Sequence, residues 1–342
     1  MLKAFGVGLL CTLGIWYFNE LIKFLDINKV VYSQQPGPCR AVEGVYVPEQ
    51  GYQGSEDVEV LPNGIAIFSS GLNYMRNPAL KHVQGRMMMF DLSNPDEPAK
   101  ALRLTGFTRK INPHGISLFT VDGAVYVYFI HHAMDEVDSD ESVEKFRLND
   151  LVVAQEDQFY ATNDYVLRHR FLRTLEYFSF LPIGNVVYYD GHKGRKVAES
   201  LRRANGINMS PDKKYVYVAE AGAKRITTFR RSANGDLSKV SSTFMGTLVD
   251  NINVDPETGN LWVASHPIGY KIYLKVAFPV GSVAPSLVLR VNVSEGVITE
   301  TTQIYSDDGR NLIGSGSAVF QNGKVLIGTP THILMYCECL TC

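Results

Sequence analysis

Hydrophobic residues along most of the chain occur in short runs that turn residues interrupt. After residue 40, apolar runs alternate with Gly, Asn, Asp and Pro, and few stretches show the 3.6-residue period of an amphipathic helix. This alternation is typical of strands that are joined by tight turns. The pattern therefore predicts an all-β domain.

One unit recurs six times along this domain. It consists of a polar pair or a glycine, an apolar strand, a turn, and a second apolar strand that ends in small residues. The copies read EDVEVLPNGIAIFSSG, HGISLFTVDGAVYVYFI, NDLVVAQEDQFYATND, NGINMSPDKKYVYVAEAG, DNINVDPETGNLWVAS and GSGSAVFQNGKVLIGT. Each copy would supply the two inner strands of a blade, and the variable stretches between copies would form the outer strands. Six copies predict a six-bladed β-propeller over residues 39–342.

The second repeat is shorter than the others. The interval from Gly115 to Asp150 is 35 residues, whereas the other intervals between repeats run from 45 to 65 residues. A four-stranded repeat usually needs about 40 to 50 residues. We therefore expect the second blade to lack its outermost strand, and a truncated or alternatively spliced chain would show the same spacing.

The N-terminus carries a continuous apolar segment. Residues 4–18 contain no charge, Lys3 precedes them, and Asn19 and Glu20 follow them, as in a secretory targeting segment. Bulky aromatic residues stand where a cleavage site would need small ones. We therefore expect residues 1–27 to remain as a signal-anchor helix in the membrane, with the propeller luminal or extracellular. A cleaved signal peptide, a secreted chain that keeps this segment and a helix along the membrane interface are the alternatives.

Charge and cysteine content narrow the class of protein. The formal net charge of -2, without a stripe of Lys and Arg, argues against a nucleic-acid partner. Five cysteines fit the oxidising compartment that the N-terminus implies. Cys39 begins the domain and Cys337, Cys339 and Cys342 end it. A bridge from Cys39 to one of these three would join the first and last blades.

Polar residues stand at the starts of four predicted inner strands. They are Glu56 with Asp57, Asn149 with Asp150, Asn205, and Asp250 with Asn251. Because the innermost strands of a propeller begin around its central tunnel, these side chains should converge. Their oxygen atoms suit a hard cation, and six to eight such ligands suit Ca²⁺ better than Mg²⁺. A single pair would more simply cap a turn, but four coincident starts favour a metal site.

At these residues the chain resembles the paraoxonase/arylesterase family of calcium-dependent lactonases. The resemblance runs from about Cys39 to Cys337 and rests on GSEDVEVLPNG, FSSGLNY, NPHGIS, RLNDLVV with FYATND, ANGINMSPDKKYVYVAE, LVDNINVDPETGNLWV and LMYCE. It implies a six-bladed propeller with two Ca²⁺ in its tunnel, a retained hydrophobic N-terminus and a disulfide between Cys39 and Cys337.

The resemblance also implies two sets of calcium ligands. A catalytic Ca²⁺ would be held by Glu56, Asn149, Asn205, Asp250 and Asn251. A structural Ca²⁺ deeper in the tunnel would be held by Asp57, Asp150 and the backbone carbonyl of Ile116.

The histidine pair of the family falls on His114 of NPHG and His132 of YFIHH. We expect His131 on the opposite side of the strand, because side chains alternate. In the implied chemistry, Ca²⁺ polarises the carbonyl of a lipophilic lactone or aryl ester, and His114, oriented by His132, activates water. Without the resemblance, two lone histidines would be ordinary core or rim residues. No G-x-S-x-G motif is present, which argues against a serine hydrolase.

Further positions concern the substrate pocket and modification. Tyr74 and His266 match pocket residues of the family. Arg203 stands where the family has a large apolar residue, so a cation would line the mouth of a site that is expected to be apolar. Of two glycosylation sequons, Asn208 lies in a strand start and is expected to be too buried, which leaves Asn292 as the candidate.

These observations predict a calcium-dependent hydrolase of lactones and aryl esters, attached to a membrane or lipoprotein surface by its N-terminus. The alternative is a non-catalytic paraoxonase-like protein of the endoplasmic reticulum that assists the assembly of membrane-protein clients. The retained anchor, Arg203 and the short second blade favour this alternative. The complete set of ligands and both histidines favour the enzyme.

Overall fold

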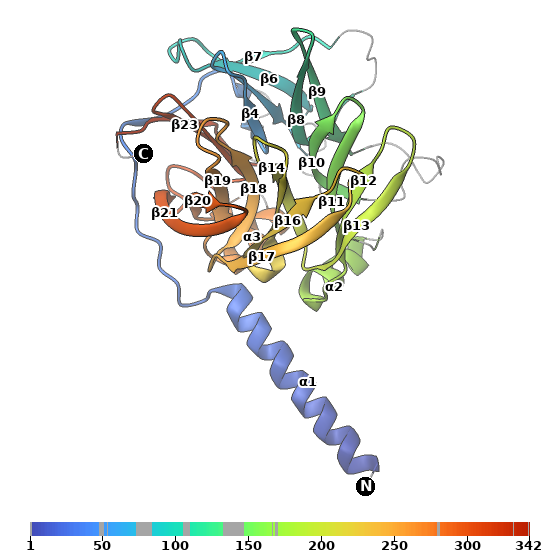
Figure 1. Cartoon of the computed structure of the whole chain (residues 1–342). Coiled ribbons are helices and arrows are strands. Elements are labelled where there is room, and N and C mark those ends of the chain that lie inside the picture. Colours follow the sequence, from blue (N-terminus) through green and yellow to red (C-terminus); the bar gives the residue numbers. More distant parts are fainter. Residues whose placement is uncertain are drawn as a thin grey trace.

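A β-propeller follows one long N-terminal helix, α1 (Leu2–Leu25), which projects away from it (Figure 1). The prediction of an all-β propeller behind a helix is therefore confirmed. The computed structural model describes residues 2–47, 51–52, 54–72, 84–104, 110–132, 147–165, 167, 170–278, 281–330, 332–340 and 342.

Five antiparallel four-stranded sheets form the full blades, and four of them use strands in chain order. The first contains β4 (Val58–Val60), β5 (Ile65–Ser70), β6 (Arg86–Asp91) and β7 (Lys100–Ala101). The next contains β10 (Arg147–Gln155), β11 (Gln158–Tyr165), β12 (Gly184–Tyr189) and β13 (Gly194–Leu201). It is followed by β14 (Ala204–Met209), β15 (Tyr215–Glu220), β16 (Arg225–Arg231) and β17 (Leu237–Phe244). The fourth contains β18 (Leu248–Val254), β19 (Leu261–His266), β20 (Ser286–Ser294) and β21 (Val297–Asp307).

The last blade joins the two ends of the domain. It consists of β22 (Ser317–Gln321), β23 (Lys324–Gly328), β24 (Met335–Glu338) and, from the N-terminal side, β1 (Cys39–Ala41). Cys39 pairs with Cys337 both in the strand register and through a disulfide with an S–S distance of 2.04 Å. The expected disulfide is thus present. Cys339 pairs with Cys342, which the sequence had left open.

A two-stranded hairpin, β8 (Pro113–Val121) with β9 (Ala124–His131), lies between the first blade and β10. The part of the chain that the structure describes therefore has five full blades and this hairpin, and the blade count differs from the predicted six. The sequence predicted the loss of one outer strand here, but the described part of this unit contains two strands only. Residues 133–146, which include the acidic tract DEVDSDESVE, lie outside the described residues. A short ribbon, β2 (Tyr46–Val47) with β3 (Gly51–Tyr52), lies before the first blade.

The innermost strands follow one another around the axis in the order β4, β8, β10, β14, β18 and β22, and β22 returns to β4. Alternate side chains of each sheet face its two neighbours, so apolar layers fill the spaces between blades. One such layer joins Val152 and Tyr160 of one blade to Ile207 and Val216 of the next. These layers fix where the strands begin, and the candidate site is built from those strand starts.

The described residues contain three further helical segments: α2 (Arg170–Ser179), η2 (Ala221–Ala223) and α3 (Gly269–Ala277). In Figure 1, α2 and α3 lie at the end of the propeller from which α1 projects. None of the helices among the described residues is both long and apolar enough to cross a membrane.

The C-terminal end of α1 is fixed on the propeller by ion pairs and apolar contacts. Glu20 Oε2 lies 2.6 Å from Arg202 Nη1, and Asp26 Oδ2 lies 2.6 Å from the buried Nζ of Lys224. Phe24 is 2% exposed in an apolar cluster with residues at the end of α2. The helix therefore leaves the domain at a fixed point.

The closing disulfide generates a stability prediction. Replacing both Cys39 and Cys337 by Ala should lower the free energy of unfolding by about 2–5 kcal/mol, because the bridge restricts a very long loop in the unfolded chain. Denaturant unfolding at constant Ca²⁺ measures the change. The Cys339→Ala/Cys342→Ala variant is the matched control, because its bridge closes a loop with a sequence separation of only 3. An equal loss in both variants would contradict the prediction.

Candidate functional site at the propeller axis

Two kinds of strand start alternate around the axis. β4, β10 and β18 bring acid and amide side chains, and the strands between them bring glycines, with Asn205 beside the glycine of β14. A Cβ on Gly115 would lie 2.3 Å from Asp150 Oδ1, and a Cβ on Gly206 would lie 2.5 Å from the Cα of Asn251. Since no side chain fits in these gaps, each glycine allows a neighbouring polar strand start to approach the axis.

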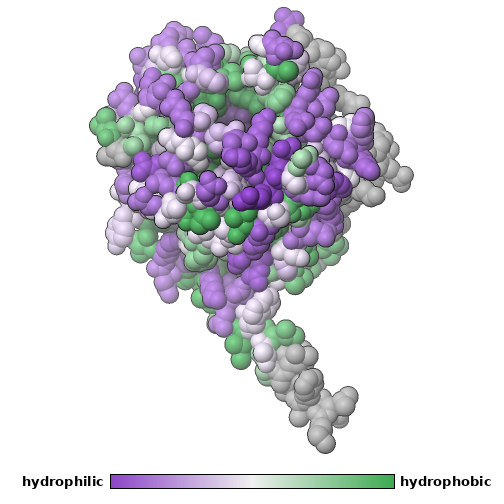
Figure 2. Space-filling model, viewed as in Figure 1, coloured by the Kyte–Doolittle hydropathy of each residue, from purple (hydrophilic) through white to green (hydrophobic). Residues whose placement is uncertain are grey.

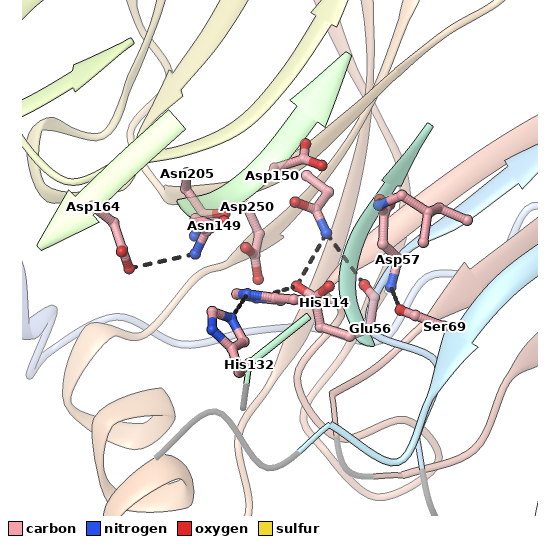
Figure 3. A network of polar contacts seen from close by, with 12 residues as sticks. Glu56, Asp57, Ser69, His114, His132, Asn149, Asp150, Asp164, Asn205 and Asp250 are labelled. Atoms are coloured by element: carbon pink, nitrogen blue, oxygen red, sulfur yellow. Dashed lines mark hydrogen bonds and ion pairs between the residues drawn. The ribbon is translucent and has the colours of Figure 1, made fainter. Parts of the chain in front are cut away.

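The predicted ligands of the first calcium ion come together in this region (Figure 3). Glu56, Asn149, Asp250 and Asn251 are each at most 6% exposed. Four buried oxygens from the set have no hydrogen-bond partner: Glu56 Oε2, Asn149 Oδ1, Asn205 Oδ1 and Asn251 Oδ1. Burial of an unpaired polar atom is costly. Four unpaired acceptors from four strands are the arrangement that a hard cation would satisfy.

Asparagine supplies three of these four oxygens. Across the described ranges, no group of three or more His, Cys, Asp or Glu side chains is placed to hold a metal ion. Amide and carboxylate oxygens together are a donor set that suits Ca²⁺. The residues present therefore fit the calcium ion that the sequence predicts.

The two predicted histidines are in contact with each other and with this set. His114 Nδ1 lies 2.9 Å from His132 Nε2, and His114 Nε2 lies 3.3 Å from Glu56 Oε1. His131 instead accepts a hydrogen bond from the backbone N–H of Asn112 at 3.0 Å, so it is His132 whose ring contacts His114. Burial lowers the pKa of His114, but the charge and hydrogen bond of Glu56, together with the charges of Asp164 and Asp150, outweigh it and raise this pKa overall.

Asp57 and Asp150 have a different arrangement from the first set. Each carboxylate accepts the N–H of the following residue in its own strand and a backbone N–H of the next inner strand. Asp57 Oδ2 lies 2.8 Å from the N of Ile116, and Asp150 Oδ2 lies 2.8 Å from the N of Ile207. The backbones of the two residues are also held in the same way. The N–H of Asp57 donates to the hydroxyl of Ser69, and the N–H of Asp150 donates to the hydroxyl of Thr162. They fasten neighbouring inner strands together.

Burial is the main electrostatic feature of these two carboxyls. It raises the pKa of Asp57 well above its usual range, and the negative charges of Asp150 and Glu56 raise it further. Burial likewise raises the pKa of Asp150. Because a divalent cation favours the charged form of a carboxylate, binding of one here would oppose both shifts.

The other predicted residues have different outcomes. His266 Nε2 lies 2.7 Å from Asp250 Oδ2, so it belongs to the site. Arg203 is partly buried just before β14, with a positive φ of 54°. Tyr74 lies outside the described residues.

The two glycosylation sequons differ in their surroundings. The side-chain amide of Asn208 donates a hydrogen bond to the carbonyl of Ile252. The side-chain amide of Asn292 donates to Glu300 in an exposed contact, and glycosylation of Asn292 stays a prediction.

The sequence reasoning did not include Asp164. Asp164 Oδ2 accepts a hydrogen bond from Asn149 Nδ2 at 3.4 Å. Because the amide nitrogen of Asn149 points toward Asp164, the amide oxygen of Asn149 points away from Asp164. The only signal was its place in FYATND, which lies on the strand β11 that pairs with β10.

This geometry defines a β-propeller with an axial site made of oxygen donors and a histidine pair. A family model described as Arylesterase matches residues 39–339. Human "Serum paraoxonase/arylesterase 1" is 38% identical over 332 residues, which cover 88% of each chain. Rat "Serum paraoxonase/lactonase 3" is 35% identical over 338 residues, which cover 92% of each chain. The chain belongs to the arylesterase family, and these relatives support an esterase or lactonase enzyme.

Solved structures share the fold at low sequence identity. A luciferin-regenerating enzyme matches with a TM-score of 0.53 and 13% identity, over 89% of this chain and 96% of that chain. A gluconolactonase from Xanthomonas campestris matches with a TM-score of 0.50 and 15% identity, over 90% and 98% of the respective chains. These similarities support the propeller fold alone.

The unpaired oxygens generate a metal-binding prediction. Glu56→Gln should weaken Ca²⁺ binding by about tenfold or more, because it removes a charge from the ligand set. Isothermal titration of chelator-treated protein measures the affinity. Glu257→Gln is the matched control, since Glu257 lies in an exposed turn. Equal affinities in the two variants would show that Glu56 is not a ligand.

Proposed function

We propose that the protein is a calcium-dependent hydrolase of lipophilic lactones and aryl esters. The observation that carries this proposal is the group of four unpaired buried oxygens beside His114, which itself contacts His132. Family membership supports the reaction class, and the site supplies a place for the cation and a proton acceptor next to it.

The first Ca²⁺ would be held by Glu56, Asn149, Asn205, Asp250 and Asn251. When bound, it would supply Lewis-acid polarisation of the ester carbonyl and charge stabilisation as that carbonyl is attacked. The second would be held by Asp57, Asp150 and the carbonyl of Ile116. Each carboxylate accepts two backbone N–H groups and still has free lone pairs. This second set therefore remains able to bind an ion.

The histidines handle the proton. If Nδ1–H of His114 donates to His132 Nε2, the Nε2 of His114 is left as an acceptor on the side of Glu56. His114 can then remove a proton from a water molecule, and the carboxylate of Glu56 at 3.3 Å stabilises the resulting imidazolium. The raised pKa of His114 is consistent with a base of this kind.

The β8–β9 hairpin supports this site despite its small size. We propose that it is a reduced second blade of a sixfold ring, because β8 occupies one place in the closed series of inner strands. It contributes His114 and the N–H of Ile116, and the residue after β9 is His132. The inner part of this unit is therefore sufficient to place both histidines.

An activity assay tests the proposed function. Protein loaded with Ca²⁺ should hydrolyse members of a panel of lactones and aryl esters, and chelation should abolish the activity. His114→Gln should lower kcat by about 10²–10⁴ through loss of the proton acceptor. His192→Gln is the matched control, because His192 lies in an exposed turn.

The same assay separates the enzyme from the alternative role. If the chain binds Ca²⁺ but hydrolyses nothing in the panel, the enzyme proposal is wrong and assembly of membrane-protein clients becomes the better proposal. The partly buried cation Arg203 and the apolar surface of α1 favour that role. Client binding would survive His114→Gln, because it needs no proton acceptor.

We further propose that α1 attaches the propeller to a membrane or lipoprotein surface in the secretory pathway. Large apolar side chains on the helix are exposed, namely Leu13 (52%), Ile15 (65%) and Phe18 (59%). Figure 2 shows hydrophobic residues where α1 meets the propeller. The ion pair of Glu20 with Arg202 would hold the propeller close to that surface.

Truncation tests the attachment. A chain without residues 1–18 keeps Glu20, Phe24 and Asp26, so it should fold and bind Ca²⁺ as the full chain does. It should no longer float with lipid vesicles in a density gradient, because the exposed apolar residues are gone. Equal flotation of the two chains would place the attachment elsewhere.

A further inference from the structure

Both disulfides of the chain lie at the outer edge of the last blade. β24 carries Cys337, and Cys339 follows one residue after Glu338 ends this strand. β24 and β1 are the third and fourth strands from the axis in their sheet. Cys337 belongs to a buried apolar cluster, against which Cys39, Cys339 and Cys342 all pack. Four of the five cysteines therefore gather at one place, at the periphery of the propeller and not at its axis.

The sheet itself holds the disulfide that closes the propeller. Cys39 and Cys337 are register partners of β1 and β24, and Cys337 is 0% exposed. The backbone beside this bridge is also bonded, because the N–H of Leu340 donates to the carbonyl of Pro36 at 3.1 Å. Exchange of a disulfide requires access of a thiolate to sulfur. The folded sheet keeps these two sulfurs together and excludes an attacking thiolate from Cys337.

The Cys339–Cys342 disulfide has different surroundings. Both cysteines are partly exposed, and Leu340, which lies between them in the sequence, is 75% exposed. The N–H of Cys339 donates to the carbonyl of Gly323 at 2.7 Å, and the backbone oxygen of Cys342 accepts from Arg290 Nη1 at 3.1 Å. Neither hydrogen bond involves sulfur. Each cysteine thus has its own backbone contact, so the pair can open to two thiols and close again while the sheet stays folded.

A positive charge lies next to Cys342. Arg290 is part of β20 in the preceding blade, and its buried Nε has no hydrogen-bond partner among the described residues. A neighbouring guanidinium favours the thiolate form of a cysteine, and a Cys-x-x-Cys spacing has the same tendency. A disulfide whose reduced form is stabilised is easier to reduce. Access and charge therefore both make Cys339–Cys342 the more reducible of the two disulfides.

We propose that Cys339–Cys342 is a thiol–disulfide exchange site for low-molecular-weight thiols such as glutathione, and that Cys39–Cys337 is not exchanged in the folded protein. Cys342 also lies outside the range that the family model matches. The proposed exchange uses none of the axial residues, so it is independent of ester hydrolysis.

The exchange takes place in two steps. A glutathione thiolate attacks the sulfur of Cys339, the S–S bond breaks, and its electron pair leaves on Sγ of Cys342, where Arg290 stabilises the charge. A second glutathione thiolate attacks the glutathionyl sulfur of the mixed disulfide and releases the Cys339 thiolate and glutathione disulfide. The protein disulfide gains two electrons, two glutathiones are oxidised, and the two protons that they lose go to the protein thiolates.

A redox titration of the full chain loaded with Ca²⁺ tests the proposal. Cys11 is an exposed free cysteine, so the titration uses a Cys11→Ser background to exclude exchange with it. Samples at graded [GSH]²/[GSSG] ratios are quenched with acid and alkylated, and mass spectrometry then measures each cysteine. Cleavage after Glu338 separates Cys337 from Cys339. Half-reduction of Cys339–Cys342 should need a ratio at least about 100-fold lower than that of the Cys39 bridge.

Variants test the attacked sulfur and the charge separately. Cys342→Ser leaves the Cys339 thiol without its partner, so this variant should take up one glutathionyl group from glutathione disulfide. Arg290→Gln should raise the ratio at half-reduction of Cys339–Cys342 about 2- to 10-fold, because it removes the charge that favours the thiolate. Arg290→Lys keeps the charge and should restore the wild-type ratio. Arg310→Gln is the matched control, since the Arg310 side chain is 85% exposed in a separate turn.

Three outcomes would overturn the proposal. They are half-reduction of both disulfides at the same ratio, a Cys339–Cys342 pair that stays oxidised at the highest glutathione excess, and a Cys342→Ser variant that takes up no glutathione. Continued oxidation of the Cys39–Cys337 bridge in the same samples shows that the last blade is still folded when the other pair is reduced. If Arg290→Gln does not fold, the Cys342→Ser measurement still decides whether the site exchanges.

Discussion

The structure depends on the burial of carboxyl groups at the axis of the propeller. Glu56, Asp57 and Asp150 are each at most 4% exposed, and their charges raise one another's energy in a region that excludes water. Backbone N–H groups of neighbouring inner strands compensate part of this cost, so the carboxylates hold the inner strands together. The uncompensated oxygens beside them are the chemical basis of the proposed calcium site.

Glycines make this arrangement possible. Gly115 and Gly206 stand where any side chain would collide with the adjoining strand start. The alternation of glycine starts and acidic starts therefore brings oxygens from separate parts of the chain together around one axis (Figure 3). His114 directly precedes Gly115, so the same close approach that admits Asp150 also places the proposed base.

The axial site and the N-terminal helix share one end of the propeller. The start of β18 pairs with the end of β19. Helix α3 follows directly after β19 and contacts α1. Arg202, which binds Glu20 of α1, is three residues before Asn205 of the proposed calcium site. If α1 attaches to a lipid surface, a lipophilic substrate would reach the site from that surface without crossing the bulk solvent.

The sequence by itself determined the propeller class, the strand starts that converge at the axis and the pairing of Cys39 with Cys337, because repeats and family motifs are local patterns. It also separated His132 from His131, since side chains alternate along a strand. Tertiary structure alone decided that β8–β9 is a hairpin beside five full blades, that Asp164 orients Asn149, and that Asp57 and Asp150 join neighbouring inner strands. Those facts depend on which backbone groups of distant segments lie side by side, and a repeat pattern carries no such distances.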